Sequence, residues 1–125
     1  MAGVTLDAGG LIALDRGDRR ALLLMQRTAD RGETVEVPAT ALAQAVRRPV
    51  RQVRMARLLR APTTRVVPLD RVDATSVGQL LASSNTTDIA DAHVVVCARR
   101  SGQPVVTSDP DDLRRLDPAI ALVVV

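Results

Sequence analysis

Short apolar runs alternate with longer amphipathic stretches along this chain. The runs that read as strands lie at residues 3–7, 34–37, 65–68, 103–107 and 119–125. Apolar residues at helical spacing predict helices at about residues 9–14, 18–28, 40–48, 50–60, 70–81, 88–101 and 109–116. Pro49 separates two of these helices, and Pro62 ends the second of them.

This alternation predicts an α/β protein with a central, mainly parallel sheet covered by helices on both faces. Val105, Val106 and residues 120–125 are all apolar, which indicates strands buried on both sides. Residues 1–125 show no repeat and are expected to form one domain. The helix residues expected to face inward are Leu22, Leu23 and Met25, and those expected on or near the buried side of the helix at residues 50–60 are Val53, Met55, Leu58 and Leu59.

Four aspartates lie where apolar runs stop. Asp7 and Asp109 follow predicted strands, and Asp88 and Asp91 open the helix that ends at Gly102. Parallel strands carry their sites at their carboxyl ends, so these side chains are expected to meet at one sheet edge. Clustered carboxylates repel one another unless a cation neutralises them, and oxygen-only ligands suit Mg²⁺ or Mn²⁺. The pattern therefore favours metal-assisted phosphodiester chemistry.

A lone aspartate is usually a turn residue or a helix N-cap. That role is assigned to Asp15, Asp18, Asp30, Asp70, Asp73 and Asp117. Asp109 differs because Asp111 and Asp112 follow it, and together they place more negative charge at one helix start than capping requires.

The amino-acid composition excludes some classes of catalytic chemistry. The chain has no aromatic residue, and its 17 basic residues are all arginines. Chemistry that depends on lysine, such as a P-loop or a Schiff base, is therefore excluded. The net charge of +3 is a mild indication of an anionic partner. The single Cys97 excludes an internal disulfide and fits a reducing cytosol.

The first residues of the sequence and the lengths of its apolar runs give expectations about where in the cell the protein is located. No apolar run is long enough to span a membrane, so no membrane partner is expected. Met1 to Val4 carry no basic residue and lead directly into a strand, so no secretory signal is predicted. A cytoplasmic location is expected.

Six arginines within 14 residues form an arginine stripe. They are Arg47, Arg48, Arg51, Arg54, Arg57 and Arg60. A spacing of three would keep most of them on one side of a helix, either as a solvated face or as a surface for RNA phosphates or an acidic partner. Without aromatic residues, bases can stack only on arginine planes, which favours recognition of RNA shape and backbone.

Other polar residues near the aspartates are weaker candidates. His93 and Cys97 are four residues apart, a spacing that can bind Zn²⁺, but no second pair exists. A core-facing cysteine and a satisfied or exposed histidine are therefore favoured. Thr107 and Ser108 have no His–acid pair to activate them, so they are expected to orient a metal-bound water or a phosphate oxygen rather than act as nucleophiles.

Asp7 after the first strand, residues 87–93 and residues 105–113 together resemble the motifs of PIN-domain ribonucleases. The likeness is greatest to the toxins of VapBC toxin–antitoxin modules, and it covers essentially the whole chain. Its most specific parts are the Val-Thr-Ser-Asp segment that ends at Asp109 and the pair Asp91-Ala92 before the long helix.

The resemblance implies a three-layer α/β/α sandwich and a metal-dependent endoribonuclease that cuts tRNA or rRNA. It implies Mg²⁺ or Mn²⁺ bound by Asp7, Asp91 and Asp109, with Asp88 as an additional carboxylate that shares the metal. It also implies a VapB-like antitoxin partner and a homodimer. The residues expected behind the ligands or toward the substrate are Gln44, Asp112, Thr107, Arg48 and Arg51.

One residue departs from the family pattern. Gln44 stands where the family usually has a second acidic residue, a glutamate. An amide oxygen can reach a metal or its water, but it carries no charge. Three interpretations remain open: Asp88 replaces the missing charge, the site holds one metal only, or the nuclease is weakened or inactive. Ala8 and Gly9 also differ, because the family often has serine or threonine after its first aspartate.

Two function classes therefore compete: a toxin endoribonuclease, and a PIN-like module that binds RNA or an antitoxin-like protein without cutting. Gln44 is the feature that separates them. A phosphoacceptor receiver needs a lysine that this chain lacks, and a haloacid-dehalogenase-type phosphatase needs Asp-x-Asp where residues 7–9 read Asp-Ala-Gly.

Overall fold

A parallel five-stranded sheet forms the centre of the computed structural model, which describes residues 3–125. The strand order is β3-β2-β1-β4-β5, and every pairing is parallel. The strands are β1 Gly3–Leu6, β2 Thr34–Pro38, β3 Thr64–Val67, β4 Val105–Thr107 and β5 Leu122–Val124. The prediction that there is no secretory signal rests partly on Met1 and Ala2. These two residues lie outside the described residues.

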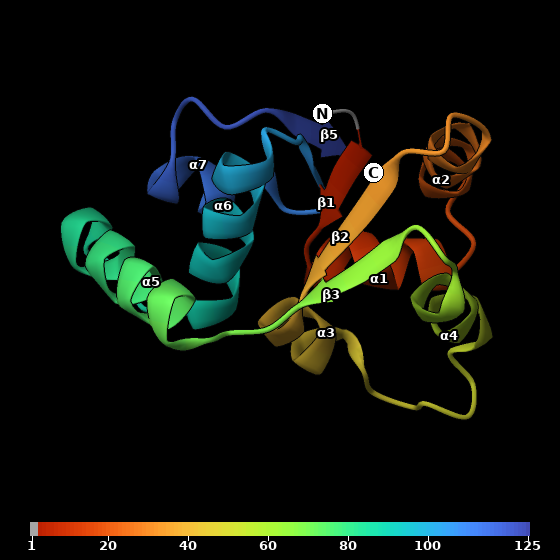
Figure 1. Cartoon of the computed structure of the whole chain (residues 1–125), viewed down its shortest axis with the longest axis horizontal. Coiled ribbons are helices and arrows are strands. Elements are labelled where there is room, and N and C mark those ends of the chain that lie inside the picture. Colours follow the sequence, from red (N-terminus) through yellow and green to blue (C-terminus); the bar gives the residue numbers. More distant parts are fainter. Residues whose placement is uncertain (1–2) are drawn as a thin grey trace.

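Seven helices connect and flank the strands. They are α1 Ala8–Asp15, α2 Arg19–Asp30, α3 Ala39–Ala45, α4 Val53–Arg60, α5 Arg71–Ser84, α6 Ile89–Ser101 and α7 Pro110–Leu116. In Figure 1, α1, α2 and α4 lie on one side of the sheet and α5, α6 and α7 on the other. This confirms the predicted three-layer α/β/α sandwich with its central parallel sheet.

Alternating strand residues supply both halves of the core. Leu6 and Val106 belong to the cluster that also holds Leu11 of α1 and Met55 of α4. The neighbouring strand residue Val105 belongs to the opposite cluster, which Val77, Leu80, Val94 and Leu113 complete. Successive strand side chains point to opposite faces, so each inner strand contributes to both layers.

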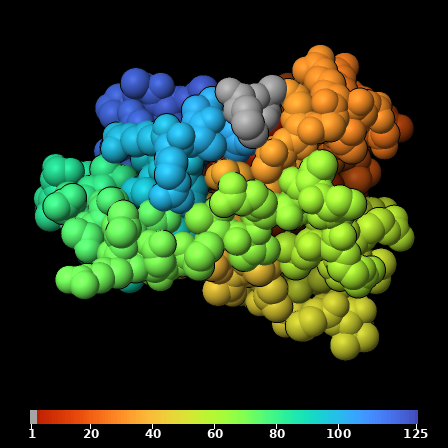
Figure 2. Space-filling view, in the orientation of Figure 1, coloured from red at the N-terminus to blue at the C-terminus, as the bar shows by residue number. Residues whose placement is uncertain are grey.

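Helix α3 joins the two layers, because Ala41 belongs to one core cluster and Ala45 to the other. It also packs against α1 and α6. Figure 2 shows a continuous surface in which β3 and the segment leading to α5 run across the front of the molecule, above α3. The position of α3 fixes where Gln44 lies.

The burial of two predicted helix faces differs from expectation. Leu22 and Leu23 are 37% and 52% exposed, whereas Met25 packs against the core as predicted, together with Leu24 and the buried Ala21 and Thr28. Val53, at the first position of α4, is 56% exposed, whereas Met55 is buried as predicted. Four consecutive apolar residues at 22–25 fit more than one helix register, and packing against the sheet selects one that the sequence does not specify.

The last strand is also less buried than its apolar sequence indicates. Strand β5 lies at the edge of the sheet, and Val124 is 39% exposed. An edge strand pairs with one neighbouring strand only. Its apolar residues alone therefore do not establish that helices cover both of its faces. Among residues 3–125, no helix is both long and apolar enough to cross a bilayer.

Candidate active site: a carboxylate cluster at the switch point of the sheet

The strand order reverses between β1 and β4, which are neighbours in the sheet although most of the chain lies between them. From β1, the chain runs outward through β2 to β3, and later returns to build β4 and β5 on the other side. Loops therefore leave this point in opposite directions and open a crevice beyond the carboxyl ends of the strands. Asp7 and Asp109 follow the two strands that border this crevice.

Asp7 is fixed by the start of helix α1. It is 5% exposed, and its Oδ1 accepts a hydrogen bond of 2.7 Å from the backbone N–H of Gly10. Burial raises the pKa of Asp7, and the charge of Asp109 raises it further, while hydrogen bonds from Thr107 and Gly10 partly offset the shift. The start of α1 thus holds the Asp7 carboxylate in a position where its ionised form is disfavoured.

Asp91, in the first turn of α6, has the most perturbed carboxyl of the cluster. Burial raises its pKa to about 7, and the carboxylates of four other residues add to the shift. In order of effect, these are Asp88, Asp7, Asp112 and Asp109. The structure therefore brings together all the acidic residues that the sequence analysis selected, around Asp91.

Asp109 lies between β4 and α7, and Thr107 organises this junction. Thr107 is fully buried, and its Oγ1 accepts a hydrogen bond of 3.0 Å from the Asp109 backbone N–H. The same side chain lowers the pKa of Asp7 through a hydrogen bond. Thr107 thus connects the aspartates at the ends of β1 and β4.

Asp88 is the N-cap of α6, since its Oδ1 accepts a 2.9 Å hydrogen bond from the Asp91 backbone N–H. Its exposed side chain lines a shallow cleft that also contains Thr40, Gln44 and Thr87. Gln44 is exposed on α3. The residue that departs from the family pattern thus lies on the wall of the same cleft as the additional carboxylate.

The sequence analysis missed Arg115. It lines the cleft beside Asp91 and Asp112, together with Asn85 and Thr86. Its Nη1 lies 3.8 Å from Asp112 Oδ1, an i,i+3 pair on α7. The sequence could have indicated Arg115, because it follows Asp112 by three residues and residues three apart lie on the same face of a helix.

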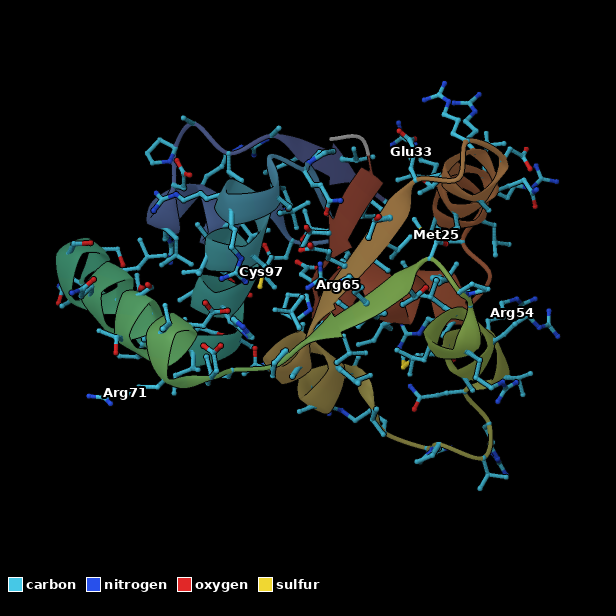
Figure 3. The ribbon with its side chains drawn as sticks, in the orientation of Figure 1. Met25, Glu33, Arg54, Arg65, Arg71 and Cys97 are labelled. Atoms are coloured by element: carbon cyan, nitrogen blue, oxygen red, sulfur yellow. The ribbon has the colours of Figure 1, made fainter. Side chains whose placement is uncertain are left out.

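The arginine stripe does not lie on one helix. Arg54, Arg57 and Arg60 belong to α4, but Arg47, Arg48 and Arg51 lie in the loop before it. This loop is held by Gln52, whose Oε1 accepts hydrogen bonds from the backbone N–H groups of Arg47 and Arg48, at 2.9 and 3.1 Å. Figure 3 shows Arg54 of α4 at the outer side of the molecule. The prediction of a continuous helical stripe was therefore wrong.

Asp73 and His93 also differ from their assigned roles. Asp73 is 2% exposed and paired with Arg100, so it is no simple turn or capping residue. His93 is fully buried on α6, and its Nε2 has no hydrogen-bond partner among the described residues. Cys97 faces the core, as expected.

The donor set at the crevice fits a hard divalent cation. The side chains that converge there carry carboxylate oxygens and no nitrogen or sulfur donor, which is the ligand type that Mg²⁺ and Mn²⁺ prefer. The raised pKa of Asp91 shows that full ionisation of the cluster is unfavourable without a counter-charge. A bound divalent cation would supply that charge.

The raised pKa of Asp91 predicts a pH-dependent stability in the absence of metal. The pKa of about 7 in the folded state exceeds the ordinary value of 3.8, so the folded protein retains a proton that the unfolded chain releases. The stability that this retained proton contributes to the folded state is fully present below pH 3.8 and is lost as the pH rises through 7. We expect Asp91→Asn to melt near the natural chain at low pH and at least about 3 °C above it at neutral pH.

Thermal melts of both chains in EDTA across this range test the prediction. Asp117→Asn is a useful comparison, because Arg99 and the Ala119 N–H lower the pKa of Asp117 despite its burial, which gives the opposite dependence. A constant difference in Tm between the natural chain and Asp91→Asn at all pH values would show that the Asp91 carboxyl is not perturbed.

The fold and this site define an α/β/α protein with an acidic centre at the switch point of a parallel sheet. A model of the PIN domain family matches residues 4–118, and the chain belongs to this family. The prediction from the sequence motifs is therefore confirmed. Membership of the family supports a nuclease activity in general. A search of curated protein sequences gave no match.

Solved structures with a similar fold include several toxins. One is Mycobacterium tuberculosis VapC20, a Sarcin-Ricin loop cleaving toxin, with a TM-score of 0.71, 17% identity, and coverage of 98% of this chain and 99% of that chain. Another is VapBC2 from Rickettsia felis bound to promoter DNA, with a TM-score of 0.68, 13% identity and 98% coverage of both chains. A third is VapBC-5 from M. tuberculosis, with a TM-score of 0.56, 27% identity, and coverage of 99% of this chain and 97% of that chain.

Proposed function

We propose that this chain is a divalent-metal-dependent endoribonuclease and the toxin of a type II toxin–antitoxin pair, acting on structured RNA such as tRNA or rRNA. The observation that carries the proposal is the convergence of four acidic side chains on Asp91 at the switch point of a PIN-domain sheet. The similar structures named as VapC and VapBC proteins support the toxin assignment.

In this proposal, Asp7, Asp91 and Asp109 hold Mg²⁺ or Mn²⁺, and Asp88 shares it. The bound ion would supply an activated water and offset the charge that develops on the phosphate. Thr107 keeps the Asp7 and Asp109 segments in register through its two hydrogen bonds. Asp112 adds negative charge beside Asp91, while Arg115 offers a guanidinium at the cleft that can contact a phosphate oxygen.

Arg48 and Arg51 are the proposed contacts to the RNA backbone. Both are exposed in the loop between α3 and α4, and neither forms an ion pair within residues 3–125. The loop follows α3 directly, and α3 carries Gln44 at the edge of the cleft. Arginines in such a place can grip phosphates without selecting bases.

The experiment that tests the proposal is cleavage of total cellular RNA by the natural chain and by Gln44→Glu, with Mn²⁺ or with EDTA. We expect discrete cuts by the natural chain that require the metal. Because Asp88 stands on the same cleft wall and supplies the missing charge, Gln44→Glu should change the rate by less than about tenfold, or 1.4 kcal/mol.

The second candidate function is a binding module without nuclease activity. The observation that favours it is Gln44, an uncharged side chain where the family usually has an acid. The same experiment separates the two functions. Absence of cutting by the natural chain, together with metal-dependent cutting by Gln44→Glu, would establish a binding module built on a disabled site.

An antitoxin is the proposed protein partner, and α2 and α4 offer a place for it. A cleft between them is lined by Leu14, Leu22, Met25 and Leu58, with Arg54 and Arg57 at its border. An apolar helix flanked by acidic residues would match this surface in shape and charge. We further propose that the protein is a homodimer, that residues 1–125 act as one domain, and that it works in the cytoplasm.

A further inference from the structure

A second group of possible metal ligands lies apart from the carboxylate cluster, between α5, α6 and the sheet. It consists of Asp73, His93 and Cys97, which are 2%, 0% and 0% exposed. One ligand atom from each lies within 4.8 Å of the others. Figure 3 shows Cys97 on the side of α6 that faces the sheet. We call this group the Asp-His-Cys cluster.

His93 is oriented in the way a metal ligand is oriented. Its Nδ1 lies 2.8 Å from the Thr40 hydroxyl, which can accept the ring proton and leave a lone pair on Nε2. Nε2 is buried, makes no short hydrogen bond within residues 3–125, and faces Asp73 Oδ2 at 3.5 Å, an ion-pair distance. A histidine that ligates a metal commonly has its other ring nitrogen held by a hydrogen bond of this kind.

The spacing of the donors fits a tetrahedral ion. Ligand bonds of about 2.0 Å in tetrahedral geometry place a nitrogen and an oxygen about 3.3 Å apart. The observed separation of His93 Nε2 from Asp73 Oδ2, 3.5 Å, is close to this value. One carboxylate, one imidazole and one thiol form a mixed set of donors that suits Zn²⁺ better than Mg²⁺.

Glu36 is a further buried carboxylate near the Asp-His-Cys cluster, but it does not belong to the group of donors within 4.8 Å of one another. It is 8% exposed on β2, which packs against α6, and its Oε2 is buried with no hydrogen-bond partner among residues 3–125. Burial raises the pKa of the Cys97 thiol to about 12, and the nearby carboxylates of Asp73 and Glu36 add to the shift. The three donors of the cluster come from α5 and α6, and a tetrahedral ion bound by them would take its fourth ligand from solvent.

Arg100 provides the positive charge of the Asp-His-Cys cluster in this structure. Its Nη1 lies 2.6 Å from Asp73 Oδ1, and its Nη2 lies 3.0 Å from Asp73 Oδ2 and 3.9 Å from Cys97 Sγ. Nη2 thus lies between two of the donors. The side chain is 53% exposed at a surface cleft lined by Val72, Ser76 and Arg99, which gives an ion access from solvent. A small turn of the guanidinium would free Oδ2 and Sγ while Nη1 stays on Oδ1.

We propose that Asp73, His93 and Cys97 bind a zinc ion, with the Arg100 guanidinium as the group that the ion displaces from Asp73 Oδ2 and Cys97 Sγ. The ion would replace the proton of the Cys97 thiol and join α5 to α6. The site is independent of the carboxylate cluster, because the ligands come from a different side of α6 and include sulfur and nitrogen.

Titration of the full chain with Co²⁺ tests this directly, because a thiolate bound to Co²⁺ gives an intense near-ultraviolet absorption that carboxylates do not give. We expect this band in the natural chain and in Asp7→Asn, and its loss in Cys97→Ser. Arg100→Gln should tighten binding by about tenfold, because it removes the competing cation. Zinc should then abolish the band by displacement.

The rate at which Cys97 is alkylated in the natural chain is a second measurement of zinc binding, and it needs no variant. Zinc should slow the reaction of this single thiol at least about tenfold. Absence of the thiolate band in both the natural chain and Arg100→Gln, or alkylation that zinc leaves unchanged, would overturn the proposal. Neither result would affect the assignment of the nuclease site, since the matched variant Asp7→Asn reports on that site separately.

Discussion

Asp7→Asn is expected to abolish metal-dependent RNA cleavage, with a loss of at least about 100-fold, the size seen when one electrostatic group is removed from an active site. Asparagine keeps the shape of Asp7, and its Oδ1 can still accept the Gly10 N–H that fixes this position. The substitution therefore removes the charge and little else. Metal-dependent cleavage of total RNA at matched protein concentrations measures the effect.

The control for this variant is Asp111→Asn. Asp111 also lies near the start of α7, but its side chain is 82% exposed and paired with Arg114, and it is not among the carboxylates that raise the pKa of Asp91. Cleavage by Asp111→Asn should stay within about twofold of the natural rate, as expected for a weak surface pair. Equal losses in both variants would mean that general charge, rather than a metal ligand at Asp7, governs activity.

Gly10→Ala is expected to destabilise the fold by about 3 kcal/mol, in the upper part of the range for overpacked cores. A Cβ at this position would overlap the backbone oxygen of Val106 and lie 3.1 Å from the carbonyl carbon and 3.4 Å from Asp7 Oδ1. Helix α1 can pack this closely on β4 only with glycine. Urea denaturation of the variant and the natural chain measures the difference in the free energy of unfolding.

Gly78→Ala is the matched control, since Gly78 lies within α5 and a Cβ there would have no neighbour within 4 Å. It should stabilise the chain by about 0.5–1 kcal/mol through the higher helix propensity of alanine. A Gly10→Ala variant as stable as the natural chain would contradict the close contact between α1 and β4, and with it the placement of Asp7 beside β4.

The order and type of the elements could be predicted from the sequence because the strands and helices have different apolar periods. The placement of Asp7 and Asp109 at one edge of the sheet followed as well, since both come directly after strands that a parallel sheet brings together. What the sequence did not contain was the helix register at residues 22–25, where four apolar residues in succession leave the buried face undetermined.

Long-range partners account for the other differences. Asp73 was assigned a turn or capping role because its neighbours in sequence gave no other, yet its carboxylate pairs with Arg100, 27 residues away. The arginine stripe has a helical spacing from Arg48 to Arg60, but Pro49 and the hydrogen bonds of Gln52 hold the first part as a loop. Spacing along the chain cannot reveal interactions that depend on how α5, α6 and this loop are placed in space.

The most direct test of the central claim is a titration of the natural chain with Mn²⁺ in which metal binding and RNA cleavage are measured on the same samples. The carboxylate cluster around Asp91 should bind the ion and cut RNA in proportion to its occupancy, with no cutting in EDTA. Full occupancy without cutting, or discrete cuts that EDTA leaves unchanged, would contradict a nuclease site built from Asp7, Asp91 and Asp109.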